Sequence, residues 1–279
     1  LKKYYICNNM KVFTYILLLI LILFKSQFVV GQSEFETERA PDNYNQNTFG
    51  IKLNSDGVGL LYHFSTRINY RNRNIYLIEL NTLKSSKEIK VVNPYFDALS
   101  SRKFVYGKTH SVINLKVGYG FNRMIFDKRE KNSISINLSA NTGLSFAISK
   151  PIYYEIIDSV VLSGGYPIAY TSYNKMDLHL QSNPTDIIGK APFILGLNET
   201  KLHPGIFLRL SASTDFSQNV MKARMLETGI SIDFYFIPIE IMASKSNNIF
   251  LSLFVSYQFG NKYDARLNRE YRKELKKAK

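Results

Sequence analysis

The chain has 279 residues, a formal net charge of +14 and a single cysteine, Cys7. Much of the positive charge lies at the chain ends: four lysines fall within the first 31 residues, and residues 262–279 hold eight Lys or Arg against three acids. Nucleic-acid binding requires a basic face on a folded domain, and the strand patterns of this chain offer none. Composition and charge therefore exclude a nucleic-acid partner.

The first 31 residues are interpreted as an upstream extension followed by a cleavable signal peptide. Met10-Lys11 precedes an apolar run, Val12–Phe24, and the small residue Gly31 precedes the expected cleavage site. An uncleaved membrane anchor is the alternative, but Lys25 interrupts the run below the roughly twenty apolar residues that a spanning helix needs. Cleavage after Gly31 leaves an exported chain without cysteine, so a closed strand ladder must stabilise it in place of disulfides. Residues 32–46 are expected to form a periplasmic N-terminal linker.

Three weak strand patterns open the expected barrel, which occupies residues 47–260. Asn47–Leu53 and Val58–Thr66 flank Asn54-Ser55-Asp56-Gly57, whose Asp-Gly step suits a hairpin turn. Asn74–Leu80 follows a basic turn.

Five stretches then alternate apolar and polar residues: His110–Phe126, Ser133–Ser149, Gly205–Phe216, Glu227–Phe236 and Asn248–Phe259. Successive side chains of a strand point to opposite faces, so each stretch has one apolar and one polar face. They exceed the usual strand length of about five or six residues. Long strands with an apolar outer face and a polar inner face are typical of outer-membrane β-barrels. A soluble β-sandwich is the alternative, but it would pack its bulky apolar residues inward.

The fold class expected is all-β: an antiparallel up-and-down transmembrane β-barrel of about eight strands, with two long outer loops. Connections on the periplasmic side should be short and outward loops may be long. The expected periplasmic turns are Arg67–Arg73, Asp127–Asn132 and Ser217–Ala223. The expected outward loops are Asn54–Gly57, Asn81–Thr109, Lys150–His203 and Pro238–Asn247. A ten-stranded barrel is the alternative, in which Tyr153–Leu162 and Ile187–Leu197 add a hairpin.

Eight strands make a narrow barrel whose interior is filled by side chains. The charged residues expected to point inward are Lys116, Arg209, Asp215, Asp233 and Glu79. Buried charges persist only when they are paired. We therefore predict an interior charge plug in which Lys116 and Arg209 are linked to Asp233 or Glu227. An ion or proton path is the functional alternative.

Several short blocks lie outside the strand pattern: Asn93-Pro94-Tyr95-Phe96-Asp97, Phe104-Val105-Tyr106-Gly107-Lys108, Gly118-Tyr119-Gly120, Ser149-Lys150-Pro151-Ile152-Tyr153, Ala191-Pro192-Phe193, His203-Pro204-Gly205 and Pro238-Ile239-Glu240-Ile241-Met242-Ala243. Together they resemble a family of exported outer-membrane β-barrel proteins widespread in Bacteroidota and without an assigned biochemical activity. The resemblance covers about Phe49 to Tyr263. It implies the fold and a location in the cell outer membrane of a Gram-negative bacterium, and it transfers no catalytic residues.

Enzyme chemistry has weak support in the sequence. Some eight-stranded outer-membrane proteins modify lipid A with a His and a Ser or acid at the outer rim, which makes His110, Ser111 and His203 candidates for an esterase or acyltransferase. A base and its nucleophile must lie within hydrogen-bond reach, and sequence separation cannot show that. The histidines lack metal-ligand spacing, so no metal and no cofactor are expected. The protein is therefore not expected to be an enzyme.

The leading functional hypothesis is a structural, accessory or binding component of an outer-membrane complex, including one for protein export or barrel assembly. Long loops tend to carry function. Protein partners are expected at loops 81–109 and 150–203 or at the basic periplasmic tail 261–279, besides the outer-membrane lipid and lipopolysaccharide around the barrel. A small-solute channel is the remaining alternative, and it would require more strands.

Overall fold

The computed structural model describes residues 44–93, 102–127, 134–163, 166–176, 180, 184–219, 221–243 and 245–264. The expected signal peptide lies outside the described residues, as does the tail beyond residue 264. Within the described part of the chain, no helix is both long and apolar enough to span a bilayer.

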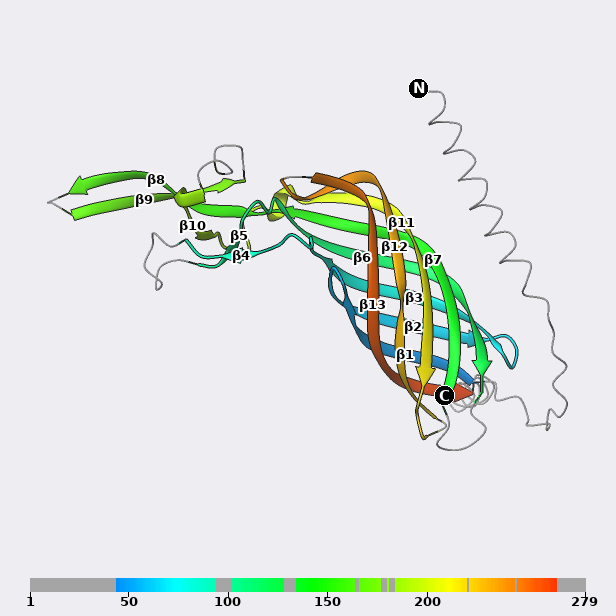
Figure 1. Cartoon of the computed structure of the whole chain (residues 1–279). Helices are drawn as coiled ribbons and strands as arrows, with labels where there is room; N and C mark the ends of the chain where they lie inside the picture. The colour runs from blue at the N-terminus through cyan, green and yellow to red at the C-terminus, as the bar shows by residue number, and fades with distance from the viewer. Residues whose placement is uncertain are drawn as a thin grey trace, which may run out of the picture. The chain divides into compact units, whose positions relative to one another are not determined.

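Eight antiparallel strands close into a barrel (Figure 1), in the order β1-β13-β12-β11-β7-β6-β3-β2. They are β1 (Tyr44–Asn54), β2 (Gly57–Arg67), β3 (Asn72–Leu83), β6 (His110–Phe126), β7 (Ser135–Pro151), β11 (Lys201–Asp215), β12 (Lys222–Met242) and β13 (Lys245–Asp264). The first and last strands close the barrel by pairing from Tyr44 opposite Asp264 to Asn54 opposite Phe254. The expected eight-stranded antiparallel barrel is confirmed.

Exposed and buried residues alternate along each barrel strand, as the period of two in the sequence predicts. In β13, every second residue from Ile249 to Phe259 is an exposed apolar side chain, and the intervening residues from Ser252 to Gln258 are buried. Polar and charged residues therefore line the interior and apolar residues cover the outside. This is the reverse of a soluble sandwich, so that alternative is wrong.

The two ends of the barrel differ in their connections. At one end, called here the turn end, the three connections are residues 68–71, 127–134 and 216–221. At the opposite loop end, the connections are residues 55–56, 84–109, 152–200 and 243–244. The two long connections thus share one end, as the alternation of short and long loops predicted.

One expected loop is wrong. Residues 238–247 were expected to connect two strands, but β12 continues to Met242 and β13 begins at Lys245. The strand pairing shifts between Phe234 and Ile239, where an irregularity adds residues to β12. The irregularity interrupts the ladder without ending the strand, so the regular alternation from which strands were predicted is lost there.

The ten-stranded alternative is also wrong. Strands β8 (Tyr153–Ser163), β9 (Tyr166–Lys175) and β10 (Ile187–Lys190) form a separate three-stranded sheet in the order β10-β8-β9. Two short strands, β4 (Lys90–Val91) and β5 (Phe104–Val105), pair with each other. The short 3-10 helices η1 (Pro184–Asp186) and η2 (Leu197–Glu199) lie between β9 and β11.

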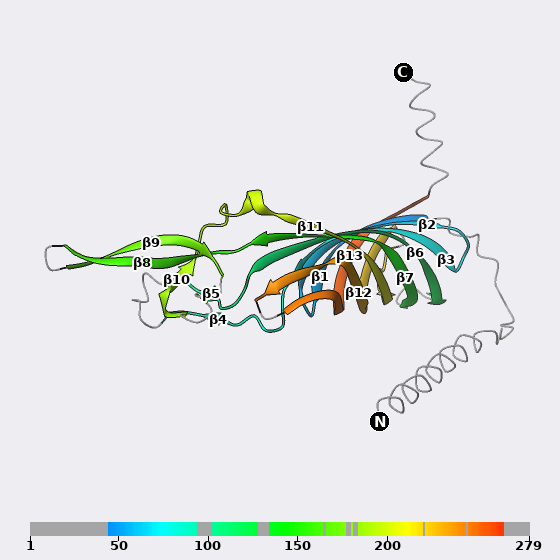
Figure 2. The ribbon, with the colours of Figure 1, turned by 90° about the horizontal axis from the view of Figure 1, so that it is seen from above.

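These elements of the two long connections, residues 84–109 and 152–200, are called here the loop-end extension (Figure 2). Its hydrophobic core contains Phe104, Ile152, Tyr154, Ile156, Leu180 and Ile187. Phe104 comes from the first long connection and the other five from the second. The two loops therefore pack together as one folded unit.

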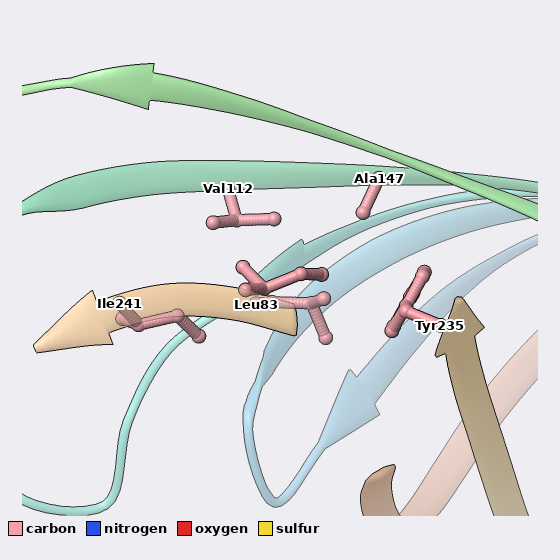
Figure 3. Packing of buried hydrophobic residues seen from close by; sticks show 6 residues of the cluster. Leu83, Val112, Ala147, Tyr235 and Ile241 are labelled. Atoms are coloured by element: carbon pink, nitrogen blue, oxygen red, sulfur yellow. The ribbon is translucent and has the colours of Figure 1, made fainter. Parts of the chain in front are cut away.

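A second apolar cluster lies where β12 reaches the loop end. Its members are Leu83, Val112, Ala147, Tyr235, Ile239 and Ile241, from strands β3, β6, β7 and β12 (Figure 3). Pairing of β11 with β12 ends at Gly205 opposite Tyr235. Beyond that point, Thr109 N, next to β6, donates to Ile241 O at 3.0 Å. Because β11 and β7 separate β12 from β6 in the barrel, the end of β12 crosses the loop end and brings its apolar side chains onto the opposite wall.

Candidate functional site

The barrel interior contains a chain of ion pairs that crosses from wall to wall. Lys52 Nζ lies 2.9 Å from Glu79 Oε2, and Arg209 donates to the other oxygen of that carboxylate. Arg209 Nη2 also lies 2.7 Å from Glu227 Oε2. Glu79 is on β3 and Arg209 on β11, which are separated by β6 and β7 on one side of the barrel and by β12, β13, β1 and β2 on the other. Their contact therefore spans the interior.

A second ion pair crosses the interior nearby. Lys116 Nζ lies 2.7 Å from Asp233 Oδ1 and donates to Ser231 Oγ at 2.9 Å. Lys116 belongs to β6 and Asp233 to β12, which are not neighbours in the barrel. With Lys52, Arg209, Glu79 and Glu227, this pair brings three cations together with three carboxylates. These six charges balance one another.

Two inward aromatic rings fill the space between the charges. The Phe254 ring lies 4.2 Å from Lys52 Nζ and 4.4 Å from Arg209 Cζ, measured to its centroid. The Phe207 ring lies 5.4 Å from Lys116 Nζ. Cations over aromatic faces are attracted by the ring quadrupole, most strongly when water is excluded. The rings thus stabilise charges that burial would otherwise penalise.

Glycines make room for one of these rings. Phe207 lies opposite Gly143, which in turn lies opposite Gly118 on the next strand. A Cβ atom on Gly118 would lie 2.6 Å from Phe207 Cζ, closer than real Cβ contacts. The absence of side chains on both glycines lets the ring extend over two strands of the wall.

Hydrogen bonds complete the surroundings of the central charges. Glu227 accepts from Ser211 Oγ and from Gln258 Nε2. His63 Nε2 lies 3.4 Å from Arg209 Nη1, and the arginine side chain is fully buried. In such a network every polar group needs its partner. A group left unpaired destabilises the fold, because its desolvation on burial is no longer offset by a hydrogen bond.

The structure brings together the residues expected to form the plug: Lys116 with Asp233, and Arg209 with Glu227. Glu79, named as a further inward charge, is central because it contacts both Lys52 and Arg209. Asp215 lies apart from them and accepts from Lys262 Nζ at 2.6 Å. That these contacts act as a plug stays a prediction.

Sequence reasoning missed Lys52 and His63. Both lie on N-terminal strands whose alternation is weak, but the residues on either side of each one indicate an inward side chain. Lys52 is flanked by Ile51 and Leu53, and His63 by Tyr62 and Phe64. A polar residue between two outward apolar residues points inward in a strand.

The three rim candidates do not form one catalytic group. His110 Nδ1 lies 2.8 Å from the backbone oxygen of Glu240. His203 Nε2 lies 2.8 Å from Ser149 Oγ, a serine that was not predicted. Ser111 pairs in the strand ladder with Lys150, and no hydrogen bond joins it to either histidine among the described residues. His203 and Ser149 are both buried, unlike the exposed rim site that lipid modification would use.

Metal binding finds no support in the described part of the chain, where no group of three or more His, Cys, Asp or Glu side chains could hold an ion.

The outer surface carries an apolar band. On β13 the band runs from Ile249 to Phe259 and is bounded by Asn247 and Asn261 on the same face. Ten residue steps of about 3.3 Å, tilted by about 40°, correspond to a height of about 25 Å. That matches the apolar band of about 25 Å of a transmembrane barrel.

Aromatic side chains cluster on the outer surface near the turn end. The ring pairs there are Phe49–Phe259, Phe64–Tyr76, Tyr76–Tyr119, Tyr119–Phe121 and Phe216–Tyr257. Girdles of aromatic residues flank the apolar band of membrane barrels, where their amphipathic rings favour the interface.

Comparisons with known proteins are distant. No protein-family model matches the sequence, and no curated protein matches it. Among solved structures, the chain is similar to Neisserial surface protein A (NspA), with 11% identity, coverage of 79% of this chain and 96% of that chain, and a TM-score of 0.38. It is also similar to Ail, the attachment invasion locus protein of Yersinia pestis, with 7% identity, coverage of 80% and 99%, and a TM-score of 0.38. These identities and TM-scores are too low for the likeness to bear on function. Membership of the Bacteroidota family stays a prediction.

Proposed function

We propose that the protein is an integral outer-membrane β-barrel of a Gram-negative bacterium that acts as an accessory or binding component of an outer-membrane complex. In this proposal the turn end faces the periplasm and the loop end faces outward. The barrel anchors the loop-end extension at the cell surface and conducts no solute.

The single observation that carries the membrane location is the apolar outer band around a charged interior. A soluble protein would expose the ion pairs and bury the apolar side chains, because burial of apolar area is the main favourable term in folding. Here the exposed fraction is 55% for Ile51 and 65% for Leu251, whereas it is 0% for Glu79 and Arg209. Lipid is the solvent in which that distribution is stable.

The filled interior supports an anchoring role over transport. Ion pairs join opposite walls at two places, and the apolar cluster of Leu83, Val112 and Ile241 lies at the loop end. An eight-stranded barrel has an interior just wide enough for its side chains. The charged groups are therefore held by one another and not by a mobile ion.

The loop-end extension supports a binding role. It has its own core and ladder, and it presents exposed apolar side chains at Tyr170, Tyr173, Phe193 and Ile194. Ile194 has an exposed fraction of 77%. A folded unit held on a rigid barrel and carrying exposed aromatic and aliphatic side chains is suited to contact a protein partner.

Affinity purification from native outer membranes tests the role. We expect a tagged wild-type chain to recover a partner in stoichiometric amount. The variant Tyr170→Ser/Tyr173→Ser/Ile194→Ser should lose that partner while it still migrates as a folded barrel in unheated electrophoresis. The matched control Tyr76→Ser/Phe121→Ser on the lipid-facing wall should keep it.

Two outcomes would contradict the proposal. Recovery of no stoichiometric partner by the wild type would argue against an accessory role. A wild-type chain that remains soluble and monomeric without detergent would argue against the membrane location itself.

A further inference from the structure

The connection between β3 and β6 is strongly basic. Five of its described residues are exposed cations: Lys84, Lys87, Lys90, Arg102 and Lys103. Its described carboxylate, Glu88, is already paired, because Lys108 Nζ lies 2.7 Å from Glu88 Oε1. Within the described part of the chain, none of the five exposed cations has an ion-pair partner.

The fold brings the two halves of this connection together. Residues 84–90 and 102–108 are two arms joined by the β4–β5 ladder, in which Lys90 lies opposite Val105. The Lys108–Glu88 ion pair joins the arms a second time. Phe104 is buried in the core of the extension, so its neighbour Lys103 points to the opposite face, which Lys90 shares.

A sixth cation joins them from β10. A Cβ atom on Gly189 would lie 2.7 Å from Arg102 Cβ, so Arg102 lies against this strand next to the exposed Lys190. The acids on the elements packed nearby are Asp56, Glu88, Glu155, Asp158, Asp186 and Glu240. Seven cations, counting Lys108, therefore face six carboxylates. The part of the loop-end extension that carries Lys84, Lys87, Lys90, Arg102, Lys103 and Lys190 is called here the basic surface.

The basic surface begins at the border of the apolar band. Lys84 directly follows Leu83, the last residue of β3, and the last apolar residue on the outward face of that strand is the exposed Leu80, which precedes Thr82 on that face. If the loop end faces outward, this border lies at the level of the lipid headgroups. Cations near an anionic lipid surface gain attraction that falls off within a Debye length.

We propose that the basic surface binds the phosphate groups of the anionic glycolipid of the outer leaflet. This inference rests on the proposed membrane location and outward loop end. It assigns the surface to the headgroup phosphates of lipid around the barrel. The exposed apolar side chains of the extension stay available for a protein partner.

The test compares lipids that differ only in phosphate. Full-length protein refolded into nanodiscs of zwitterionic phosphatidylcholine is titrated with diphosphoryl lipid A and with dephosphorylated lipid A at low salt. We expect the diphosphoryl form to bind more tightly, with affinity that falls as salt rises. In Lys90→Gln/Lys103→Gln, affinity should fall about 25-fold, because each cation near an anionic surface contributes about fivefold.

The matched control is Lys201→Gln/Lys222→Gln, which removes two exposed lysines outside the basic surface. Its affinity should stay within about twofold of the wild type. Equal affinity for the two lipids, or equal loss in both double variants, would overturn the assignment.

A third arm separates lipid from a soluble polyanion. If soluble polyphosphate binds through Lys90 and Lys103 and diphosphoryl lipid A does not compete with it, the lipid assignment is wrong. Insertion is scored separately, by protease protection of the barrel strands in the same nanodiscs. Failure to insert would contradict the proposed membrane location, whereas correct insertion without phosphate preference would contradict this inference alone.

Discussion

Buried ion pairs in this barrel depend on both partners. Lys116 and Asp233 are almost fully buried and cross the interior between β6 and β12. Removing one partner of such a pair leaves an uncompensated charge in a medium of low dielectric constant. The cost is much larger than the net contribution of the intact pair, because pairing itself only offsets the desolvation of both groups.

Lys116→Met is therefore expected to lower the free energy of unfolding by about 3–5 kcal/mol. Lys116→Met/Asp233→Leu should recover most of that loss, since apolar residues of similar volume often replace a buried pair at little cost. Urea unfolding in lipid vesicles, followed by tyrosine fluorescence and electrophoretic mobility, measures all three proteins.

The control is the exposed pair Lys175–Glu199, which lies outside the barrel. Their contact raises the pKa of Lys175 and lowers the pKa of Glu199. Solvent screens such a pair, so Lys175→Met should leave the unfolding free energy unchanged within error. A loss for Lys116→Met no larger than for this control would show that the interior pair is solvated.

At the scale of elements, the loop-end extension is held by a side chain of β8. Tyr154 Oη donates to Lys108 O at 2.6 Å and is within 2.8 Å of Val105 O. Its ring packs edge-on against Phe104. Burial raises the pKa of the Tyr154 hydroxyl, so the group stays a protonated donor at neutral pH. One residue thus joins the two long connections.

Tyr154→Phe is expected to destabilise the extension by about 1–3 kcal/mol, because the Lys108 carbonyl loses its donor from the Tyr154 hydroxyl. Limited proteolysis should cleave the extension faster, while the barrel keeps its heat-dependent mobility. The neighbouring Tyr153→Phe removes a hydroxyl that is exposed and bonded to Glu199, and should leave the cleavage rate nearly unchanged. Equal rates in the two variants would show that Tyr154 does not hold the extension.

For the whole molecule, closure leaves no unpaired strand edge within the barrel. Each of the eight strands pairs with two neighbours, and β1 and β13 pair along 11 residues. Closure also sets the width of the interior, which the three cations and three carboxylates cross. A barrel filled in this way should not conduct ions steadily.

Planar-bilayer recording of the refolded wild type tests this expectation. No steady large conductance is expected, because opening a path would require separating at least two buried ion pairs and the apolar cluster at the loop end. Insertion is verified in parallel by protease protection. Steady, large conductance from inserted protein would instead support the small-solute channel.

The alternation of residues was enough to predict most of the barrel. A strand places its side chains by local geometry, so the facing of Lys116 or Leu138 follows from its neighbours in sequence. The number of strands and their antiparallel order were then predicted from the number of strand patterns and from the alternation of short and long connections. The ten-stranded alternative added Tyr153–Leu162 and Ile187–Leu197, which overlap β8 and β10, because these strands form by the same local rules although their hydrogen bonds belong to a separate sheet.

By itself, the sequence determined which side chains face inward and which face outward, because a period of two is a property of one strand. Only the tertiary structure decided which inward charges meet. Glu79 contacts Arg209 across 130 residues of sequence because the strand register brings β3 and β11 to face each other over a narrow interior. The crossing of the loop end by β12 and the approach of the two arms that carry the basic surface have the same origin. Both depend on contacts between distant segments, which no local pattern encodes.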